Sequence, residues 1–239
     1  MKKSPLFELV EERKLPNFQY IDAPTIQWII ANKPRFNIVR EVELPKRNTL
    51  NRYIPKQSWF SEKRVINSIH GLRHILRVVA YVSLISQKSQ NKNIKNILVA
   101  AAIHDIRRKN DKSDTGHGLR AAHWFRKNVS EVAKEFKVEF TSGDEKEIFW
   151  TTLFHESPRH VFLGGQNYSR FKESIDMLRI ADALDRYRLP KTKWWISNNV
   201  LKYSVPTRFK KIAFEFMVKS EQNFLDGKSS KESVLSMLL

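Results

Sequence analysis

The sequence contains no cysteine among its 239 residues. Disulfides, thiolate nucleophiles and cysteine-ligated zinc or iron–sulfur centres are therefore excluded, and any bound metal must be held by histidine, carboxylate or carbonyl groups. Glycine and proline are scarce, with 7 and 9 residues, which excludes a collagen-like or linker-dominated chain. The longest aliphatic run, residues 97–103, is far too short to cross a bilayer.

Acidic residues are also few, because 25 Asp and Glu stand against 43 Lys and Arg and leave a formal net charge of +18. Such a one-sided excess favours a polyanionic partner, which could be nucleic acid, a nucleotide or an acidic membrane surface, and we expect a nucleotide or single-stranded nucleic acid. A general basic bias without a bound partner is the alternative. No apolar segment follows the basic start of the chain, so we expect a cytoplasmic protein with no membrane association.

Proline content, hydrophobic periodicity and charge divide the sequence into three parts. Residues 1–60 are interrupted by recurring prolines, which predicts a mostly irregular N-terminal extension. Within it we expect short helices near 5–14 and 24–32, and a short strand in 36–44, where apolar and polar residues partly alternate. Residues 61–189 carry helical periodicity, and residues 190–239 form a basic and aromatic C-terminal appendage packed on the bundle. The expected fold class is all-α.

Apolar residues at helical spacing place the individual helices. The second is apolar through its middle, which predicts a central, buried position. Ser61 resembles a capped start, Asp114 is expected to cap the third helix, and Ser142 with Glu145 has capping-box spacing. The predicted helices span 61–82, 94–108, 114–136, 142–156, 170–188, 206–225 and a short segment from 230.

All seven histidines lie between residues 70 and 160. His70 and His74 share one helix face, because they are four residues apart. His104 and Asp105 directly follow the apolar run of the second helix, where an unpaired carboxylate would carry a desolvation cost of several kcal/mol. Histidine and aspartate that converge from several helices are typical ligands of a divalent cation such as Mn, Mg, Ni, Co, Fe or Zn.

Three short motifs, in a fixed order along the chain, make this pattern similar to that of a known family. Residues 74–78 (HILRV), the doublet His104-Asp105 and Asp182 resemble the H…HD…D signature of the HD-domain metal-dependent phosphohydrolases. The segments that follow the doublet and that surround Asp182, residues 104–122 and 181–186, are similar to the corresponding segments of bacterial members. The resemblance covers about half of the chain.

The resemblance implies an HD-domain helical bundle that holds one or two divalent ions. The implied metal ligands are His74, His104, Asp105 and Asp182, and Asp105 would also serve catalysis. The other implied catalytic residues, His117 and His155, match positions where two-metal members add histidines, so they would hold a second ion or position the phosphate. The implied function is hydrolysis of a phosphoester of a nucleotide or nucleic acid by metal-activated water. A single-strand-directed nuclease, or a nucleic-acid-binding regulatory protein with a structural or vestigial metal site, remain alternatives.

Other residues near the motifs have candidate roles of their own. Arginines beside the doublet and after Asp182 are expected to bind the substrate phosphate. Asp185 is expected to orient a ligand or to pair with a nearby arginine. His70 and His160 either meet substrate or have no role in the site, and His123 is expected to pack or lie at the surface. The predicted phosphate-binding residues are Arg107, Arg108, Arg186 and Arg188.

The segment 186–211 combines eight Lys and Arg with aromatic residues and contains no Asp or Glu. Lysines on phosphates and a tryptophan under a base would suit a single strand, with Lys191, Lys193 and Trp194 or Trp195 in those roles. Alternatively, the tryptophans join the C-terminal helices to the bundle core and the charges are merely solvated. A second basic stretch lies at residues 33–56.

Overall fold

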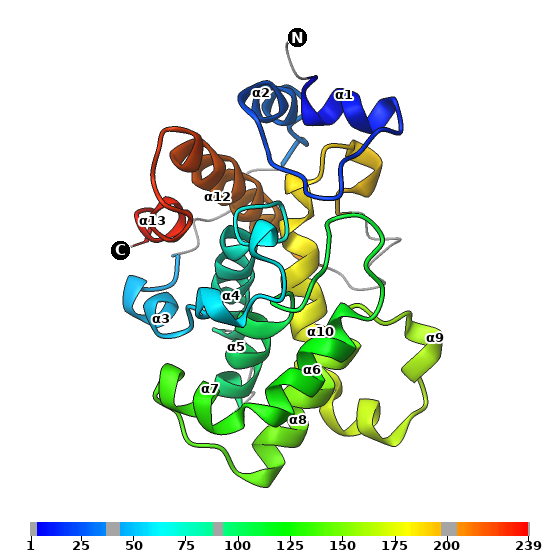
Figure 1. Cartoon of the computed structure of the whole chain (residues 1–239), viewed down its shortest axis with the longest axis vertical. Helices are drawn as coiled ribbons and strands as arrows, with labels where there is room; N and C mark the ends of the chain where they lie inside the picture. Colours follow the sequence, from blue (N-terminus) through cyan, green and yellow to red (C-terminus); the bar gives the residue numbers. More distant parts are fainter. Residues whose placement is uncertain (1–3, 37–43, 88–92, 197–204, 239) are drawn as a thin grey trace.

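The computed structural model describes residues 4–36, 44–87, 93–196 and 205–238, and every regular element in these ranges is helical (Figure 1). Four 3₁₀ turns connect the α-helices, at Gln57–Trp59, Lys63–Val65, Asp185–Arg188 and Thr192–Trp194. The α-helices are α1 (Leu6–Glu11), α2 (Ala23–Ala31), α3 (Arg47–Arg52), α4 (Leu72–Ser86), α5 (Ile94–Ile103), α6 (His117–Lys127), α7 (Val129–Phe136), α8 (Ser142–Phe154), α9 (Arg159–Phe162), α10 (Gln166–Leu184), α12 (Thr207–Leu225) and α13 (Ser230–Leu235).

Helices α4 and α5 form the middle of the molecule (Figure 1). Helix α4 packs against α5, α10, α12 and α13, and α5 also packs against α8 and α10. Residues 99–103 of α5 are completely buried. Three of them are alanines, whose small side chains let neighbouring helices approach closely. The sequence prediction of a central buried helix is therefore confirmed.

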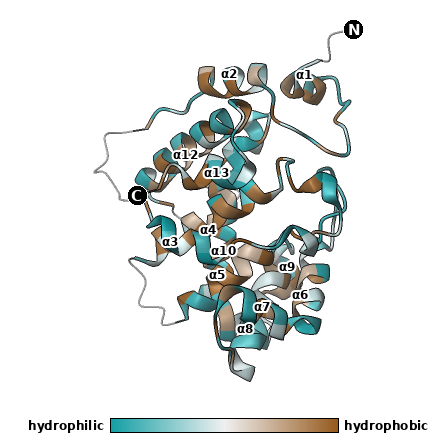
Figure 2. Cartoon of the chain, turned by 60° about the vertical axis from the view of Figure 1, so that its left-hand side comes forward, coloured by the Kyte–Doolittle hydropathy of each residue, from teal (hydrophilic) through white to brown (hydrophobic). Residues whose placement is uncertain are grey.

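The two flanking parts of the chain share the core of the bundle. Leu6, Ile29 and Leu50 from the N-terminal part belong to the same hydrophobic cluster as α4 and α5. Helix α2 packs on α12, and α3 packs on α4 and α13. Hydrophobic residues are concentrated on inner helices such as α5, whereas α3 at the periphery is largely hydrophilic (Figure 2).

The expected helix start at Ser61 is wrong, because α4 begins only at Leu72. Residues 61–71 form turns, one of which is capped by the Glu62 side chain, which accepts a hydrogen bond from the Arg64 amide. The chain folds back so closely that a Cβ on Gly71 would lie 2.2 Å from the backbone oxygens of Val65 and Ile66. Val65 is buried at the end of a short 3₁₀ turn rather than in an α-helix, which explains why the apolar spacing suggested a longer helix.

The predicted third helix is divided into α6 and α7 at Asn128, and it begins at His117 rather than at Asp114. Gly116 occupies the N-cap position with a φ of 82°, which favours glycine. The Asp114 carboxylate instead accepts the Lys109 amide at 2.7 Å and pairs with Arg120 at 2.6 Å. The N-cap role predicted for Asp114 is therefore wrong.

Other boundaries differ by smaller amounts. The capping box of α8 is formed by Thr141 and Asp144, one residue before the predicted Ser142 and Glu145. Helices α5 and α8 end just before His104 and His155, which occupy their C-cap positions. Helices α12 and α13 were predicted closely, whereas α3 and α9 were missed. Most of the strand predicted within 36–44 lies outside the described residues.

None of the described helices is both long enough and apolar enough to cross a membrane.

Candidate metal centre

Six of the predicted site residues converge at one place inside the bundle, although they come from five different helical segments. Five of them are almost completely buried, between 0% and 6% exposed, and the side chain of the sixth, Asp182, is 31% exposed. His74 lies on α4, His104 and Asp105 lie at the end of α5, His117 begins α6, His155 ends α8, and Asp182 lies on α10.

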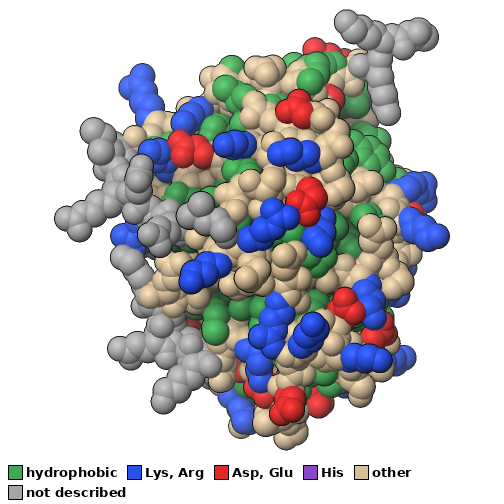
Figure 3. Space-filling model, turned by 90° about the vertical axis from the view of Figure 1, so that its left-hand side faces the viewer, with side chains coloured by type: hydrophobic (Ala, Val, Ile, Leu, Met, Phe, Trp, Pro, Cys, Tyr) green, Lys and Arg blue, Asp and Glu red, His purple; other side chains and the backbone are tan. Residues whose placement is uncertain are grey.

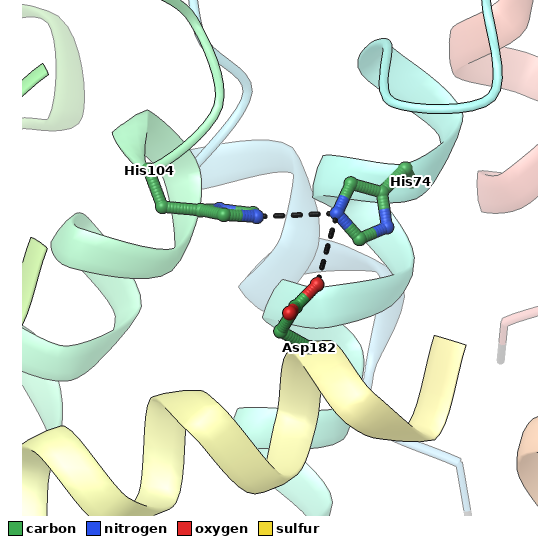
Figure 4. Close-up of side chains that lie close together, drawn as sticks. All are labelled: His74, His104 and Asp182. Atoms are coloured by element: carbon green, nitrogen blue, oxygen red, sulfur yellow. Dashed lines mark hydrogen bonds and ion pairs between the residues drawn. The ribbon is translucent and has the colours of Figure 1, made fainter. Parts of the chain in front are cut away.

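The first group of possible ligands is His74, His104 and Asp182 (Figure 4). The Nε2 atom of His74 lies 3.2 Å from Nε2 of His104 and 3.3 Å from Oδ1 of Asp182. Their ligand atoms all lie within 4.8 Å of one another, so one cation could contact all three. Helices α4, α5 and α10 thus each supply one ligand.

The second group is His104, Asp105 and His155. Oδ1 of Asp105 lies 3.7 Å from Nε2 of His155 and 3.0 Å from Nε2 of His117. The other oxygen of the same carboxylate, Oδ2, lies 3.5 Å from Nε2 of His74. Asp105 therefore lies between the two groups and presents one oxygen to each. Oδ1 is buried and makes no hydrogen bond of good geometry within the described residues, which leaves it available to a cation.

Each histidine of the centre uses its Nδ1 atom for a hydrogen bond that points away from the ligand groups. Nδ1 of His104, His117 and His155 donates to the backbone oxygens of residues 101, 114 and 152, at 2.6–2.7 Å. Nδ1 of His74 donates to Oδ2 of Asp185 at 2.7 Å. Because these oxygens only accept, a hydrogen is assigned to Nδ1 of each histidine, and the Nε2 atoms point inward. This is the orientation that metal-bound histidines show in proteins.

The electrostatics of the centre keep its carboxylates charged. Burial alone would raise the pKa of Asp105, but Arg108 and the neighbouring histidines hold it well below its usual range. His74 and Arg188 similarly outweigh burial and lower the pKa of Asp182. Burial lowers the pKa of His104 to about 3, so this imidazole is neutral at physiological pH, as a ligand must be.

The pKa of His117 is raised, whereas that of His104 is lowered. Burial lowers its pKa, but Asp105 and Glu156 outweigh that effect and raise the pKa to about 9. Oε2 of Glu156 lies 2.8 Å from Nδ1 of His117, and its other oxygen accepts the Gly118 amide at 2.6 Å. A proton and a cation would compete for His117 Nε2.

Two of the four predicted phosphate-binding arginines lie at the centre. Nη1 of Arg108 lies 3.6 Å from Oδ1 of Asp105 and 3.2 Å from Nε2 of His117. Arg188 is also buried and lies 3.5 Å from Oδ2 of Asp185. Both guanidinium groups are fixed by backbone oxygens, Arg108 by Asn110 and Arg188 by Ile69.

The other two arginines are engaged elsewhere. Arg107 donates to the backbone oxygen of Trp59 at 3.0 Å, and Arg186 donates to that of Trp194 at 2.6 Å. Within the described residues neither forms an ion pair with the carboxylates of the centre. The structure therefore does not bring them together with the ligand groups.

A chain of buried charges behind His74 was missed by the sequence analysis. Asp185 accepts from both His74 and Arg77, with 2.6 Å between Oδ1 of Asp185 and Nε of Arg77. Arg77 also pairs with Glu221 at 2.6 Å, and Glu221 pairs with Arg73 at 2.8 Å. Asp185 therefore contacts the predicted ligand His74, and its expected pairing with a nearby arginine is confirmed at Arg188. Arg73 and Arg77 are the visible signal, because two arginines on an apolar helix require buried partners.

A second device fixes the end of α8, which carries His155. Nη1 of Arg179 donates to the backbone oxygens of Phe154, His155 and Ser157, at 2.6–3.0 Å, and so satisfies the free carbonyls of the helix end. Helix α6 approaches His155 so closely that a Cβ on Gly118 would lie 2.9 Å from the imidazole. The sequence analysis identified neither role.

The remaining histidines lie outside the two groups. His70 pairs with Asp111 at 2.9 Å beside the centre. His123 lies on α6 against Phe149 and Arg126, which confirms its predicted packing role. His160 is exposed on α9.

Part of the basic segment 186–211 is buried in the folded chain. Trp195 is 6% exposed, packs against Trp28, Tyr187 and Phe214, and donates to the backbone oxygen of Leu189. The prediction that Trp195 stacks on a base is therefore wrong, and the alternative of a core contact is confirmed for it. Residues 197–204 of the segment lie outside the described residues.

No protein-family model, curated protein or solved structure matches this chain. The resemblance to the HD-domain phosphohydrolases thus stays a prediction based on the motifs, and the geometry of the centre is an independent observation.

Proposed function

We propose that the protein is a metal-dependent phosphohydrolase that cleaves a phosphoester of a nucleotide or nucleic acid. The observation that carries this proposal is the position of Asp105, whose buried carboxylate presents one oxygen to each of two histidine-containing groups. Four inward-facing Nε2 atoms surround it. This arrangement would be costly to bury without a cation or protons to satisfy it.

His74, His104, Asp105 and Asp182 would hold the metal, and His117 and His155 would either contribute to a second ion or contact the phosphate. Nitrogen and oxygen donors without sulfur suit Mn, Mg, Ni, Co, Fe or Zn. When bound, a divalent cation supplies Lewis-acid polarisation of a phosphoryl oxygen and lowers the pKa of a coordinated water.

The protein's own residues prepare this chemistry. The hydrogen bond from His74 to Asp185 keeps the proton on Nδ1 and leaves Nε2 free to bind. The buried guanidinium groups of Arg108 and Arg188 would offset negative charge on a transferring phosphoryl group. Because backbone oxygens fix both groups, little reorganisation is needed when substrate binds.

The first experiment combines metal analysis with turnover of bis-p-nitrophenyl phosphate in Mn²⁺ or Ni²⁺. The wild-type protein should bind metal stoichiometrically and hydrolyse the diester. His104→Ala should lose both properties, whereas His123→Ala, which removes a histidine outside the centre, should keep them. Full metal content and turnover in His104→Ala would refute the proposal.

A second candidate is a nucleotide- or nucleic-acid-binding protein in which the metal is structural. The burial of the centre favours this second candidate, because only Asp182 among the six residues has a side chain that is substantially exposed. Stoichiometric metal without hydrolysis of bis-p-nitrophenyl phosphate or any nucleotide, together with a lower melting temperature after metal removal, would support this candidate.

A further inference from the structure

His70 and Asp111 form a histidine–carboxylate pair beside the metal centre, and the proposed function does not use it. Nδ1 of His70 lies 2.9 Å from Oδ1 of Asp111. The carboxylate is completely buried, and it also accepts the Ser68 hydroxyl at 2.9 Å and the Gln19 amide at 2.8 Å. Three donors thus hold Asp111 in place, and Asp111 holds the imidazole.

The pair stands at the edge of the centre. The imidazole rings of His70 and His74 are nearly perpendicular, with 5.9 Å between their centroids. The side chain of His70 is 12% exposed, so its ring borders both the ligands and solvent. Arg108 and Arg188 lie close enough to act on its charge.

The hydrogen bonds define what His70 can recognise. Asp111 accepts from the Gln19 amide and the Ser68 hydroxyl, so the hydrogen of the His70–Asp111 bond is assigned to Nδ1 of His70, and Nε2 of the neutral ring keeps a lone pair. Nε2 makes no hydrogen bond within the described residues and is therefore an unused acceptor.

An acceptor at this place discriminates between the parts of a phosphoester. Ionised phosphate oxygens offer only lone pairs, so they suit Arg108 and Arg188 and not Nε2 of His70. A hydroxyl group can donate to Nε2. With the phosphate at the metal centre, the adjoining carbon skeleton is the part of the substrate that reaches His70.

We propose that His70, oriented by Asp111, accepts a hydrogen bond from the 2′-hydroxyl group next to a scissile 3′-phosphoester, so that the substrate is a ribonucleotide rather than a deoxyribonucleotide. This inference rests on the proposed function, because it requires the phosphoester to lie at the metal centre. Sites that bind a substrate hydroxyl discriminate strongly against the analogue that lacks it, since the buried partner is then left unpaired.

The test measures the affinity of the full chain, loaded with Mn²⁺, for uridine 3′-phosphate and 2′-deoxyuridine 3′-phosphate by calorimetry. The wild-type protein should bind the ribonucleotide about tenfold or more tightly, in keeping with one hydrogen bond to a buried acceptor. His70→Ala should weaken only the ribonucleotide and so abolish the preference. His70→Gln, whose amide oxygen still accepts, should keep part of it, and His123→Ala should keep all of it.

Turnover of bis-p-nitrophenyl phosphate, which has no hydroxyl group, separates the two proposals. If His70→Ala retains this turnover and its metal, and loses only the preference for ribose, the inference is supported. Equal affinities in the wild-type protein, or an equal loss for both nucleotides in His70→Ala, would overturn the inference while leaving the hydrolase proposal intact. Absence of diester turnover in the metal-loaded wild-type protein would instead count against the hydrolase proposal.

Discussion

The candidate metal centre and the basic segment 186–211 were both predicted from residue patterns, but their side chains lie in different surroundings in the fold. The six residues of the centre converge from five helical segments. In the basic segment, Trp195 enters the core, Arg186 binds a backbone oxygen and Lys191 pairs with Glu11 at 3.0 Å. On the face shown in Figure 3, Lys and Arg side chains are spread over the surface with Asp and Glu among them.

Burial explains the difference. A buried carboxylate or imidazole must be satisfied by a few specific partners, so its neighbours in sequence restrict what those partners are. An exposed lysine is satisfied by water and can also pair with any nearby acid at little gain in free energy. Patterns of buried polar residues therefore predict a site more reliably than patterns of surface charge.

The strongest test of this difference replaces Asp105, which belongs to the second ligand group and whose Oδ2 also faces His74 of the first group. Asp105→Asn keeps the side-chain volume but removes the charge that would hold a cation. We expect bound metal to fall below one tenth of its wild-type content, and diester turnover to fall at least a hundredfold, since a metal-assisted reaction loses several kcal/mol of stabilisation. Asp226→Asn, at the exposed end of α12, is the matched control and should change neither property.

The next test compares a buried ion pair with a surface one. Arg77→Met leaves Asp185 buried without its main partner and removes one of the two arginines that pair with Glu221, and should lower the free energy of unfolding by about 3–5 kcal/mol. Arg47→Met breaks the exposed pair with Glu232 and should cost less than about 1 kcal/mol. Urea denaturation measures both. Similar losses for the two variants would show that burial does not distinguish these pairs.

Features with a local sequence signal could be predicted, whereas contacts between distant residues could not. Helical periodicity predicted α5, α12 and α13, because that signal is local, and the resemblance to the HD-domain signature predicted the residues of the centre. Glu221, which lies 144 residues after Arg77, could not be predicted as its partner, because no local pattern joins two such distant positions. The start of α4 was misplaced because Val65 is buried in a turn.

Trp195 provides the third test, because its core position and its predicted role on nucleic acid have opposite consequences. Trp195→Phe removes buried volume and the hydrogen bond to Leu189, and should lower the free energy of unfolding by about 1–3 kcal/mol. Under conditions in which the variant is folded, its affinity for a single-stranded oligonucleotide should equal that of the wild-type protein. A fully stable variant whose oligonucleotide affinity falls would contradict the core assignment.

The capping box of α8 gives a smaller effect with a defined pH dependence. Burial raises the pKa of Asp144, but hydrogen bonds from Thr141 and Asn96 together outweigh this and lower it to about 2, against an ordinary value of 3.8. Because the pKa is lower in the folded state, the carboxylate stabilises the fold above pH 4, and that contribution disappears as the pH falls toward 2.

Asp144→Asn should therefore cost about 1 kcal/mol of unfolding free energy at pH 7, the usual effect of a cap that is screened by solvent. The difference from the wild type should shrink as the pH falls below 4, when measured by urea denaturation at each pH. Glu145→Gln, at the position that the sequence suggested, should have little effect at any pH. A larger loss for Glu145→Gln would reverse the assignment of the cap.

The smallest expected effect concerns the lysines of the basic segment, and it decides how much of that segment remains available to a nucleic acid. Each phosphate contact to a single strand contributes about −0.7 to the slope of log K against log salt. Lys191 is already paired with Glu11, whereas Lys193 is exposed on the turn before Trp194. If a single strand binds, Lys193→Gln should flatten the slope by at most about 0.7, and Lys191→Gln should leave it almost unchanged. A flattening of about 1.4 in the double variant would show that both lysines contact phosphates. In that case the pair between Lys191 and Glu11 must open on binding, and the basic segment would be an interface as specific as the metal centre.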